Sequence, residues 1–167
     1  MKTAIETERK FLIKKPDDAF LMALEGCRKS EITQTYLDNP DGFVERVRRR
    51  VFSDRVQYTH TLKKRINAIS ATETESEITA EEYEELLTRA SAGKTPVRKT
   101  RYAIPYRGHV AEIDVYPFWE KQAVLEIELT DESDLTAFPE WLTLLREVSG
   151  NHAYSNNALS ERIPPED

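Results

Sequence analysis

The chain has 167 residues, of which 39% are hydrophobic and 32% are charged, and its formal net charge is −6. This length fits one domain, 1–167, with a sizeable core, and the negative balance argues against general binding to nucleic acid or to an anionic membrane. The single cysteine, Cys27, excludes an internal disulfide. No apolar run resembles a signal peptide or a membrane span, so we expect a soluble, cytoplasmic protein.

The first half of the chain is predicted to be mostly strands. Strand formers and turn residues place strands at 3–14, 31–38, 43–52 and 55–65. The turns between the later strands are Asn39-Pro40-Asp41-Gly42 and Ser53-Asp54. A short helix is predicted to begin at Pro16-Asp17-Asp18, because Phe20, Leu21 and Leu24 follow at helical spacing.

The second half alternates more strands with short helices. A strand at 69–78 is followed by a helix that reaches about Ala90, with Thr79 as its N-cap and Glu82 completing a capping box. Further strands are predicted at 95–106, 109–117 and 122–130, and short helices near 135–147 and 155–161. Eight strands with few helices indicate an α+β fold, most simply an eight-stranded antiparallel β-barrel with a few flanking helices.

Charged residues occupy alternate positions in most of these strands. Side chains two apart on a strand point the same way, so Glu6, Glu8 and Lys10 share one face, opposite Ile5 and Phe11. The same alternation gives further charged rows, which are Arg46 and Arg48 with Arg50, Lys63, Glu73, Glu75 and Glu77, Lys99 and Arg101, Glu112 and Asp114, and Glu126 and Glu128.

These rows can be interpreted in two ways. An antiparallel sheet commonly has a solvated polar face, which would account for any single strand. Like charges on neighbouring positions of one face repel, however, and here the two signs segregate by strand. That arrangement favours a cavity in which carboxylates hold Mg²⁺ or Mn²⁺ and Lys and Arg hold a polyphosphate. Metal-assisted phosphoryl transfer needs little else.

The common nucleotide and hydrolase motifs are missing from the sequence. It contains no GxxxxGK[ST], no GxGxxG, no HExxH and no nucleophile elbow. A covalent phospho-enzyme is an alternative in principle, but no side chain is singled out as its nucleophile.

The charged strands, taken in order, resemble one known family. Glu6-x-Glu8-x-Lys10 is similar to the signature of the CYTH superfamily, also called triphosphate tunnel metalloenzymes, in its short bacterial form. The resemblance covers nearly the whole chain and continues through Arg46-Val47-Arg48, Leu62-Lys63, Glu73-x-Glu75-x-Glu77, Lys99-Thr100-Arg101-Tyr102, Ile113-Asp114-Val115-Tyr116, Leu125-Glu126-Ile127-Glu128-Leu129 and Tyr154-Ser155-Asn156-Asn157-Ala158-Leu159.

The resemblance implies a tunnel that binds triphosphate, and a role for each charged row. Metal ions, Mg²⁺ or Mn²⁺, would be bound by Glu6, Glu8, Asp114, Glu126 and Glu128. The triphosphate would be held by Lys10, Arg46, Arg48, Lys63, Lys99 and Arg101. The catalytic group would be Lys10 with Glu73, Glu75 and Glu77, which hold a second metal or position the attacking water. Short bacterial members often carry Arg or Lys where this chain has Ala153, so that contact is lost or is replaced by the preceding His152.

The resemblance also implies an activity. We expect divalent-metal-dependent hydrolysis of the terminal phosphoanhydride of inorganic triphosphate, or of a related organic or nucleoside triphosphate. A class IV-type adenylate cyclase that makes cyclic AMP from ATP is an alternative, and so is a non-catalytic module that binds polyphosphate or nucleotide. The expected partner is a small triphosphate, with no nucleic acid and no membrane, and the protein is expected to be a monomer or a homodimer.

Overall fold

The structure, a computed structural model, describes residues 2–134 and 137–167. Its strands are β1 (Lys2–Lys14), β2 (Arg28–Leu37), β3 (Val44–Val51), β4 (Val56–Arg65), β5 (Ser70–Ile78), β6 (Val97–Tyr106), β7 (His109–Val115), β8 (Gln122–Glu128) and β9 (Leu144–Glu147). Its helices are α1 (Asp18–Met22), α2 (Ala80–Leu87), the 3₁₀ helix η1 (His152–Tyr154) and α3 (Asn156–Leu159). No helix in these described ranges is long and apolar enough to cross a membrane.

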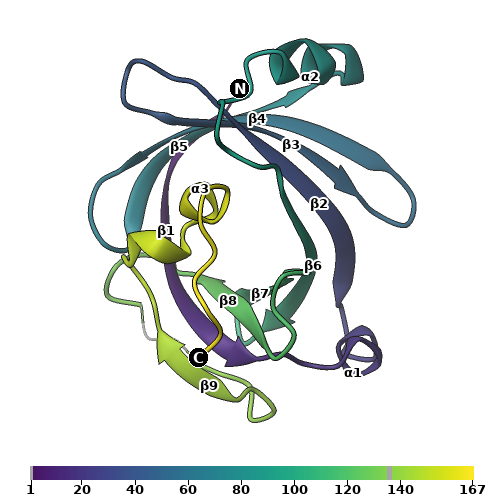
Figure 1. Ribbon diagram of the computed structural model, residues 1–167. Helices are drawn as coiled ribbons and strands as arrows, with labels where there is room; N and C mark the ends of the chain where they lie inside the picture. Colours follow the sequence, from purple (N-terminus) through teal and green to yellow (C-terminus); the bar gives the residue numbers. More distant parts are fainter. Residues whose placement is uncertain (1, 135–136) are drawn as a thin grey trace.

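Eight of the strands form a closed antiparallel barrel, which confirms the predicted fold class. Their order is β5-β4-β3-β2-β6-β7-β8-β1, and a further pairing of β1 with β5 closes the ring. The long β1 does this by changing partners, because residues 2–7 pair with β5 and residues 8–14 pair with β8. Figure 1 shows the strands as a ring, with α3 across it and α1 and α2 outside.

The helix predicted near 135–147 is wrong over residues 137–147, and residues 135–136 lie outside the described residues. Residues 144–147 instead form β9, which pairs with Phe11–Ile13 of β1. The pairing with β5 ends at Thr7, so the second half of β1 has a free edge, and β9 takes up its backbone hydrogen-bonding groups. The predicted helix near 155–161 is present as the shorter α3, and η1 precedes it.

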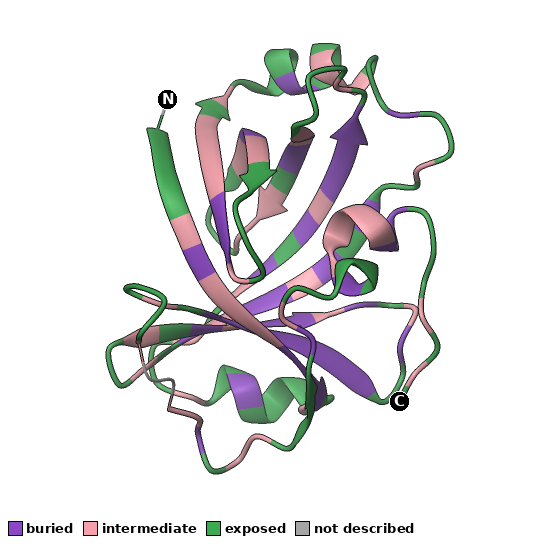
Figure 2. Cartoon of the chain, turned by 90° about the vertical axis from the view of Figure 1, so that its left-hand side faces the viewer, coloured by how far each residue is buried: buried purple, intermediate pink, exposed green. Residues whose placement is uncertain are grey.

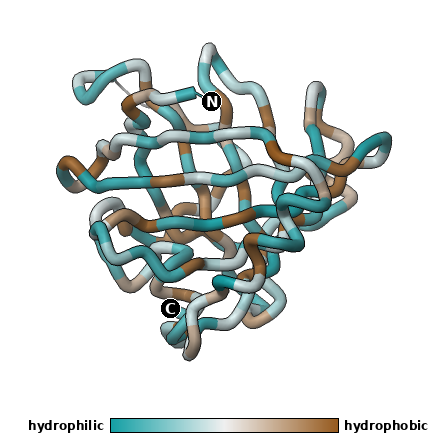
Figure 3. Tube along the Cα trace, turned by 90° about the horizontal axis from the view of Figure 1, so that it is seen from above, coloured by the Kyte–Doolittle hydropathy of each residue, from teal (hydrophilic) through white to brown (hydrophobic). Residues whose placement is uncertain are grey.

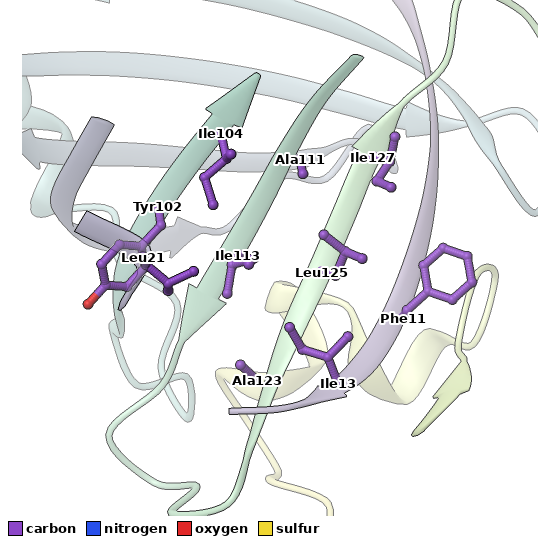
Figure 4. Packing of buried hydrophobic residues seen from close by; sticks show 10 residues of the cluster. All are labelled: Phe11, Ile13, Leu21, Tyr102, Ile104, Ala111, Ile113, Ala123, Leu125 and Ile127. Atoms are coloured by element: carbon purple, nitrogen blue, oxygen red, sulfur yellow. The ribbon is translucent and has the colours of Figure 1, made fainter. Parts of the chain in front are cut away.

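The main hydrophobic core lies outside the barrel wall. It consists of apolar side chains from β1, β6, β7 and β8 together with Leu21 of α1 (Figure 4). Alternation on each strand sends these residues outward and the charged residues inward, and Figure 3 shows the resulting change of hydropathy along the strands. Phe11 belongs to this core, whereas Ile5 is 69% exposed, at the end of β1 that is coloured as exposed in Figure 2.

A second apolar cluster attaches α2 to the outside of the barrel. Tyr83 is buried against Leu37 and Val47, and Leu86 and Leu87 pack beside it, as expected for a bracing helix. The predicted capping box is present, since Thr79 accepts from the Glu82 N–H and Glu82 accepts from the Thr79 N–H.

A third apolar cluster fills one end of the barrel. Leu12, Tyr36, Val97, Tyr116, Trp119 and Val124 meet Val148, Tyr154 and Leu159 of the C-terminal segment there. Trp119 holds the C-terminal residues over this end, because its Nε1 donates a hydrogen bond to the Pro164 carbonyl at 3.0 Å. One end of the barrel interior is therefore apolar, and the charged rows surround the remaining space.

Candidate active site: a charged cavity inside the barrel

The barrel encloses a cavity of about 650 Å³ to which all eight of its strands contribute side chains. Most of the residues predicted for the site line this cavity, and they are Glu6, Glu8, Lys10, Arg46, Arg48, Lys63, Glu73, Glu75, Arg101, Glu126 and Glu128. The inward direction of the charged rows accounts for this, because a closed barrel brings the same face of every strand to one interior. Glu77, Lys99 and Asp114 are not among the lining residues.

Lys99 and Asp114 point into the barrel like Arg101 and Glu112 on the same strands, but they form a buried ion pair that does not line the cavity. Both side chains are fully buried, and Lys99 Nζ lies 2.8 Å from Asp114 Oδ2. The other contacts of Asp114 come from Arg101, whose Nε and Nη2 donate to its two oxygens at 2.8 and 2.9 Å. Burial would raise the pKa of Asp114, but the charges of Arg101 and Lys99 outweigh it and lower that pKa to about 2. Asp114 thus orients Arg101, which lines the cavity. Glu77 is exposed at the end of β5.

Two pairs of carboxyl groups meet on one side of the cavity. The register of β1 with β8 places Lys10 opposite Glu126, and the register of β4 with β5 places Lys63 opposite Glu73. Glu6 and Glu73 share a hydrogen bond, as do Glu8 and Glu126, and a third such contact, between Glu6 and Glu8, joins the two pairs. Each contact between two carboxyls requires a proton on one of them.

The pKa values of these groups are displaced in opposite directions within each pair. Burial, with the contact and charge of Glu6, raises the pKa of Glu73 to about 8. Burial would also raise the pKa of Glu6, but its hydrogen bond with Glu73 and the charge of Lys63 lower it to about 2. In the second pair, burial and the charge of Glu126 raise the pKa of Glu8 well above its usual range. Such displaced pairs are typical of sites that act on protons or bind cations.

Lysines lie between these carboxyl pairs. Lys63 Nζ lies 3.4 Å from Glu6 and 4.0 Å from both Glu8 and Glu73. Lys10 Nζ lies 3.3 Å from Glu126 Oε1. The carboxylate side of the cavity therefore already contains part of its counter-charge.

The arginines of β3 have no such partners. In the described part of the chain, Arg46, Arg48 and Arg50 form no salt bridge, whereas Lys10, Lys63, Lys99 and Arg101 all do. All three arginines line the cavity. Burial and the positive charges of Arg46 and Arg101 lower the pKa of Arg48 to about 9. Arg48 is buried and Arg46 and Arg50 are half-buried, and such a row of guanidiniums without salt-bridge partners is a binding surface for an anion.

A neutral side chain holds Arg48 in place. Nε and Nη2 of Arg48 both donate to Oε1 of the fully buried Gln34 at 3.3 Å. Gln34 Nε2 in turn donates to the Tyr36 hydroxyl at 2.8 Å. Gln34 thus fixes the guanidinium without neutralising it. Sequence reasoning missed this residue because its strand, 31–38, has no charged alternation to reveal which face points inward.

Four more charged residues line the cavity beyond those predicted for the site, and they are Arg50, Lys64, Arg65 and Glu112. Arg50 and Glu112 belong to the alternating rows but lie outside the motifs of the family resemblance. Arg50 Nε donates to Ser30 Oγ at 2.9 Å, and Arg101 Nη1 donates to Glu112 at 3.1 Å. The alternation alone would have found Arg50 and Glu112.

The C-terminal segment borders the cavity at the end where β3 begins. Residues from Val148 to Asn157 contribute to the lining, including His152 but not Ala153. Gly150 has a φ of +73°, and a Cβ built there would lie 2.9 Å from Cβ of Ala68 in the turn between β4 and β5. This close approach requires glycine. His152 is therefore the residue of this segment that could contact a ligand in place of a basic residue at position 153.

The carboxyl groups fit a divalent cation chemically. Within residues 2–134 and 137–167, no three potential ligands are close enough together to form a metal site as they stand. Glu6, Glu8, Glu126 and Glu128 nevertheless face one cavity, and hard oxygen donors suit Mg²⁺ or Mn²⁺. The carboxyl–carboxyl contacts among Glu6, Glu8, Glu73 and Glu126 can be stabilised by a cation as well as by a proton.

Comparison with known proteins places these features in a wider group. The CYTH domain family matches residues 4–156. Among solved structures, the inorganic triphosphatase NE1496 is 27% identical, with a TM-score of 0.58 over 96% of this chain and 97% of that one. The PH1819 protein of Pyrococcus horikoshii is 24% identical, with a TM-score of 0.59 over 80% of this chain and 79% of that one.

A plant structure shares the fold at lower identity. The putative adenylyl cyclase HpAC1 from Hippeastrum, described as having a dominant triphosphatase activity, is 16% identical, with a TM-score of 0.51 over 74% of this chain and 80% of that one. At this identity the likeness shows the fold alone. Comparison with curated protein sequences gives no significant match.

Proposed function

Because the chain belongs to the CYTH domain family, we propose that it is a divalent-metal-dependent triphosphatase that hydrolyses the terminal phosphoanhydride of inorganic triphosphate. The observation that carries the proposal is the row of unpaired guanidiniums on β3, which shares one cavity with the paired carboxyl groups. A polyanion would neutralise the guanidiniums of β3, and cations bound with it would neutralise the carboxyl groups. The 27% identity to an inorganic triphosphatase over nearly the whole chain supports this substrate class.

In this proposal the triphosphate lies against β3. Arg46 and Arg48 would bind its oxygens through their free guanidinium N–H groups, and Arg101, oriented by Asp114, would bind from β6. Lys10 and Lys63 would contact both the phosphates and the carboxylates, because each already lies beside a glutamate. Lys99, buried inside the barrel beneath the lining residues, would support Asp114 without contacting the substrate.

The carboxylates would serve the metal and the water. Glu6, Glu8, Glu126 and Glu128 would hold Mg²⁺ or Mn²⁺, and the bound ion would supply neutralisation of the charge that develops on the phosphate oxygens. Glu73 and Glu75 would orient the attacking water from β5. Oxygen of that water forms a bond to the terminal phosphorus as the bridging P–O bond breaks, so diphosphate leaves with the electron pair and one water proton passes to solvent.

The first test is a substrate panel. Phosphate release would be measured from triphosphate, ATP and thiamine triphosphate with Mg²⁺ or Mn²⁺, against a control with EDTA. We expect metal-dependent release that is fastest from triphosphate. Cyclic AMP formed from ATP would instead indicate a cyclase, and tight binding without turnover a binding module, and either result would overturn the proposal.

Two neighbouring arginines give a matched pair of variants. Arg48 faces the cavity, whereas Arg49, the next residue on β3, is exposed on the outer face. Arg48→Ala should lower kcat/KM for triphosphate by about 10²-fold or more, as expected when a preorganised donor to a developing charge is lost. Arg49→Ala removes the same charge and should leave kcat/KM within about twofold of the wild type. Equal effects of both variants would place the phosphates elsewhere.

A further inference from the structure

Three arginines gather around one phenyl ring just outside the cavity. The guanidinium carbons of Arg28, Arg50 and Arg55 lie 4.9, 4.7 and 4.8 Å from the ring centroid of Phe52. These residues come from the start of β2, the end of β3 and the turn before β4, and Arg28 and Arg55 are exposed. We name Arg28, Phe52 and Arg55 the Phe52 cluster, and Arg50 joins it to the cavity.

The cluster has more positive charge than its own contacts neutralise. None of Arg28, Arg50 and Arg55 forms a salt bridge with a carboxylate in the described ranges. Contact with an aromatic ring stabilises each cation only weakly at an exposed site and leaves its charge in place, so the guanidiniums still repel one another. An anion placed among them would relieve that repulsion.

The geometry of the ring restricts the kind of anion. Cations already occupy positions over Phe52 at under 5 Å, so a nucleobase could not stack on the ring without displacing them. Guanidinium N–H groups favour phosphate oxygens, which they bind in pairs. The cluster therefore suits a chain of phosphates better than a nucleoside.

The cluster continues the row of unpaired arginines inside the barrel. Arg46, Arg48 and Arg50 lie on alternate positions of β3, and with a rise of about 3.3 Å per residue the row extends about 13 Å. Arg50 lines the cavity and also contacts Phe52, so no break separates the inner row from the cluster. A linear anion that filled the row would reach Arg28 and Arg55 at its outer end.

We propose that the Phe52 cluster is a second binding site for linear polyphosphate, and that chains longer than triphosphate are substrates whose terminal phosphates lie in the cavity while the rest of the chain crosses the cluster. This inference rests on the proposed function. In each turnover, water oxygen bonds to the terminal phosphorus and the adjacent bridging P–O bond breaks. Orthophosphate is released, the shortened chain retains the bridging oxygen as a new terminal oxygen, and one water proton passes to solvent.

The test compares two double variants that lose the same charge. Arg28→Ala/Arg55→Ala removes the exposed arginines of the cluster, and Arg49→Ala/Arg98→Ala removes two exposed arginines on the outer faces of β3 and β6. Binding of a medium-length linear polyphosphate would be measured in EDTA, which prevents metal-dependent turnover. Phosphate release with Mg²⁺ would then be measured from the same polyphosphate and from triphosphate, and thermal unfolding would confirm that each variant is folded.

We expect Arg28→Ala/Arg55→Ala to weaken polyphosphate binding by about tenfold, the effect of losing two exposed ionic contacts. Its kcat/KM for polyphosphate should fall by a similar factor, while kcat/KM for triphosphate and all properties of the Arg49→Ala/Arg98→Ala control stay within about twofold of the wild type. Equal polyphosphate affinity in the two double variants would overturn the inference and leave the triphosphatase untouched. A wild type that releases no phosphate from triphosphate would overturn the proposed function, and the tenfold difference in binding would then support the second site alone.

Discussion

Gln34 orients Arg48 through two hydrogen bonds and leaves the positive charge of its guanidinium free. A carboxylate at the same position would have nearly the same shape and would accept the same hydrogen bonds from Arg48, but it could not donate to Tyr36 and it would neutralise Arg48. The choice of amide over acid at this buried position therefore decides whether the arginine is available to a phosphate.

Substitution of Gln34 tests this role in the proposed reaction. Gln34→Glu should raise KM for triphosphate by about tenfold or more, because the new ion pair competes with the substrate, and kcat should change less. Gln34→Met keeps the volume and the free charge but removes the hydrogen bonds, so its KM should rise less than that of Gln34→Glu. Steady-state kinetics of both variants provides the measurement, and a wild-type KM for Gln34→Glu would exclude the proposed role.

At the scale of elements, one buried carboxylate fastens α2 to the barrel. Glu45 of β3 accepts hydrogen bonds from Arg89, which follows α2, at 2.8 Å and from His60 and Asn39 at 2.7 and 3.1 Å. Burial would raise the pKa of Glu45, but the hydrogen bonds from Arg89 and His60 lower it below its usual value. A carboxylate whose pKa is lowered on folding stabilises the fold above its unfolded pKa and loses that contribution as pH falls through its folded pKa.

Glu45→Gln should therefore destabilise the protein in a pH-dependent way. We expect the free energy of unfolding to fall by about 1–2 kcal/mol at pH 7, since charge-assisted hydrogen bonds are lost. The difference from the wild type should shrink at acid pH, as the pH falls through the lowered pKa of Glu45 and its carboxylate in the wild type becomes protonated. Urea unfolding at neutral and acid pH measures this, and a difference that is independent of pH would mean that packing, not charge, accounts for the effect.

The elements also show which parts of the fold the sequence could predict. Alternating charges predicted the barrel strands because every inward position repeats at a period of two, and the order of the motifs predicted the residues of the cavity. The four-residue β9 could not be recognised, because it forms only where β1 has lost its neighbour β5. The sequence also could not predict which charged side chains pair with one another. Whether Asp114 faces a metal or Arg101 depends on how deeply its inward-pointing side chain is buried, which alternation does not encode.

At the scale of the whole molecule, the cavity concentrates like charges that only ligands can fully satisfy. Ligands that bind the folded state alone stabilise it by about 2.7 kcal/mol when their concentration is a hundredfold above Kd. For a chain of this size, that corresponds to a rise in Tm of roughly 5–10 °C.

Thermal unfolding with Mg²⁺ alone, triphosphate alone and both together tests this expectation. The largest rise in Tm should occur with both ligands, because each neutralises the opposite side of the same cavity. Glu81→Gln on the exposed surface of α2 provides a control that should retain the full shift. An unchanged Tm with both ligands present would contradict a site inside the barrel.

Because the hydrophobic core lies on the outside of the barrel wall, residues on the inner face of a strand can be substituted independently of those on its outer face. Along β6, β7 and β8, odd and even positions serve separate purposes, since one set packs beneath α1 and the other faces the cavity. A substitution on the inner set alters the ligand environment without opening a void in the outer packing. Mutational tolerance along these strands should therefore repeat every second residue, and new specificities can be selected on the inner positions while the outer ones preserve the barrel.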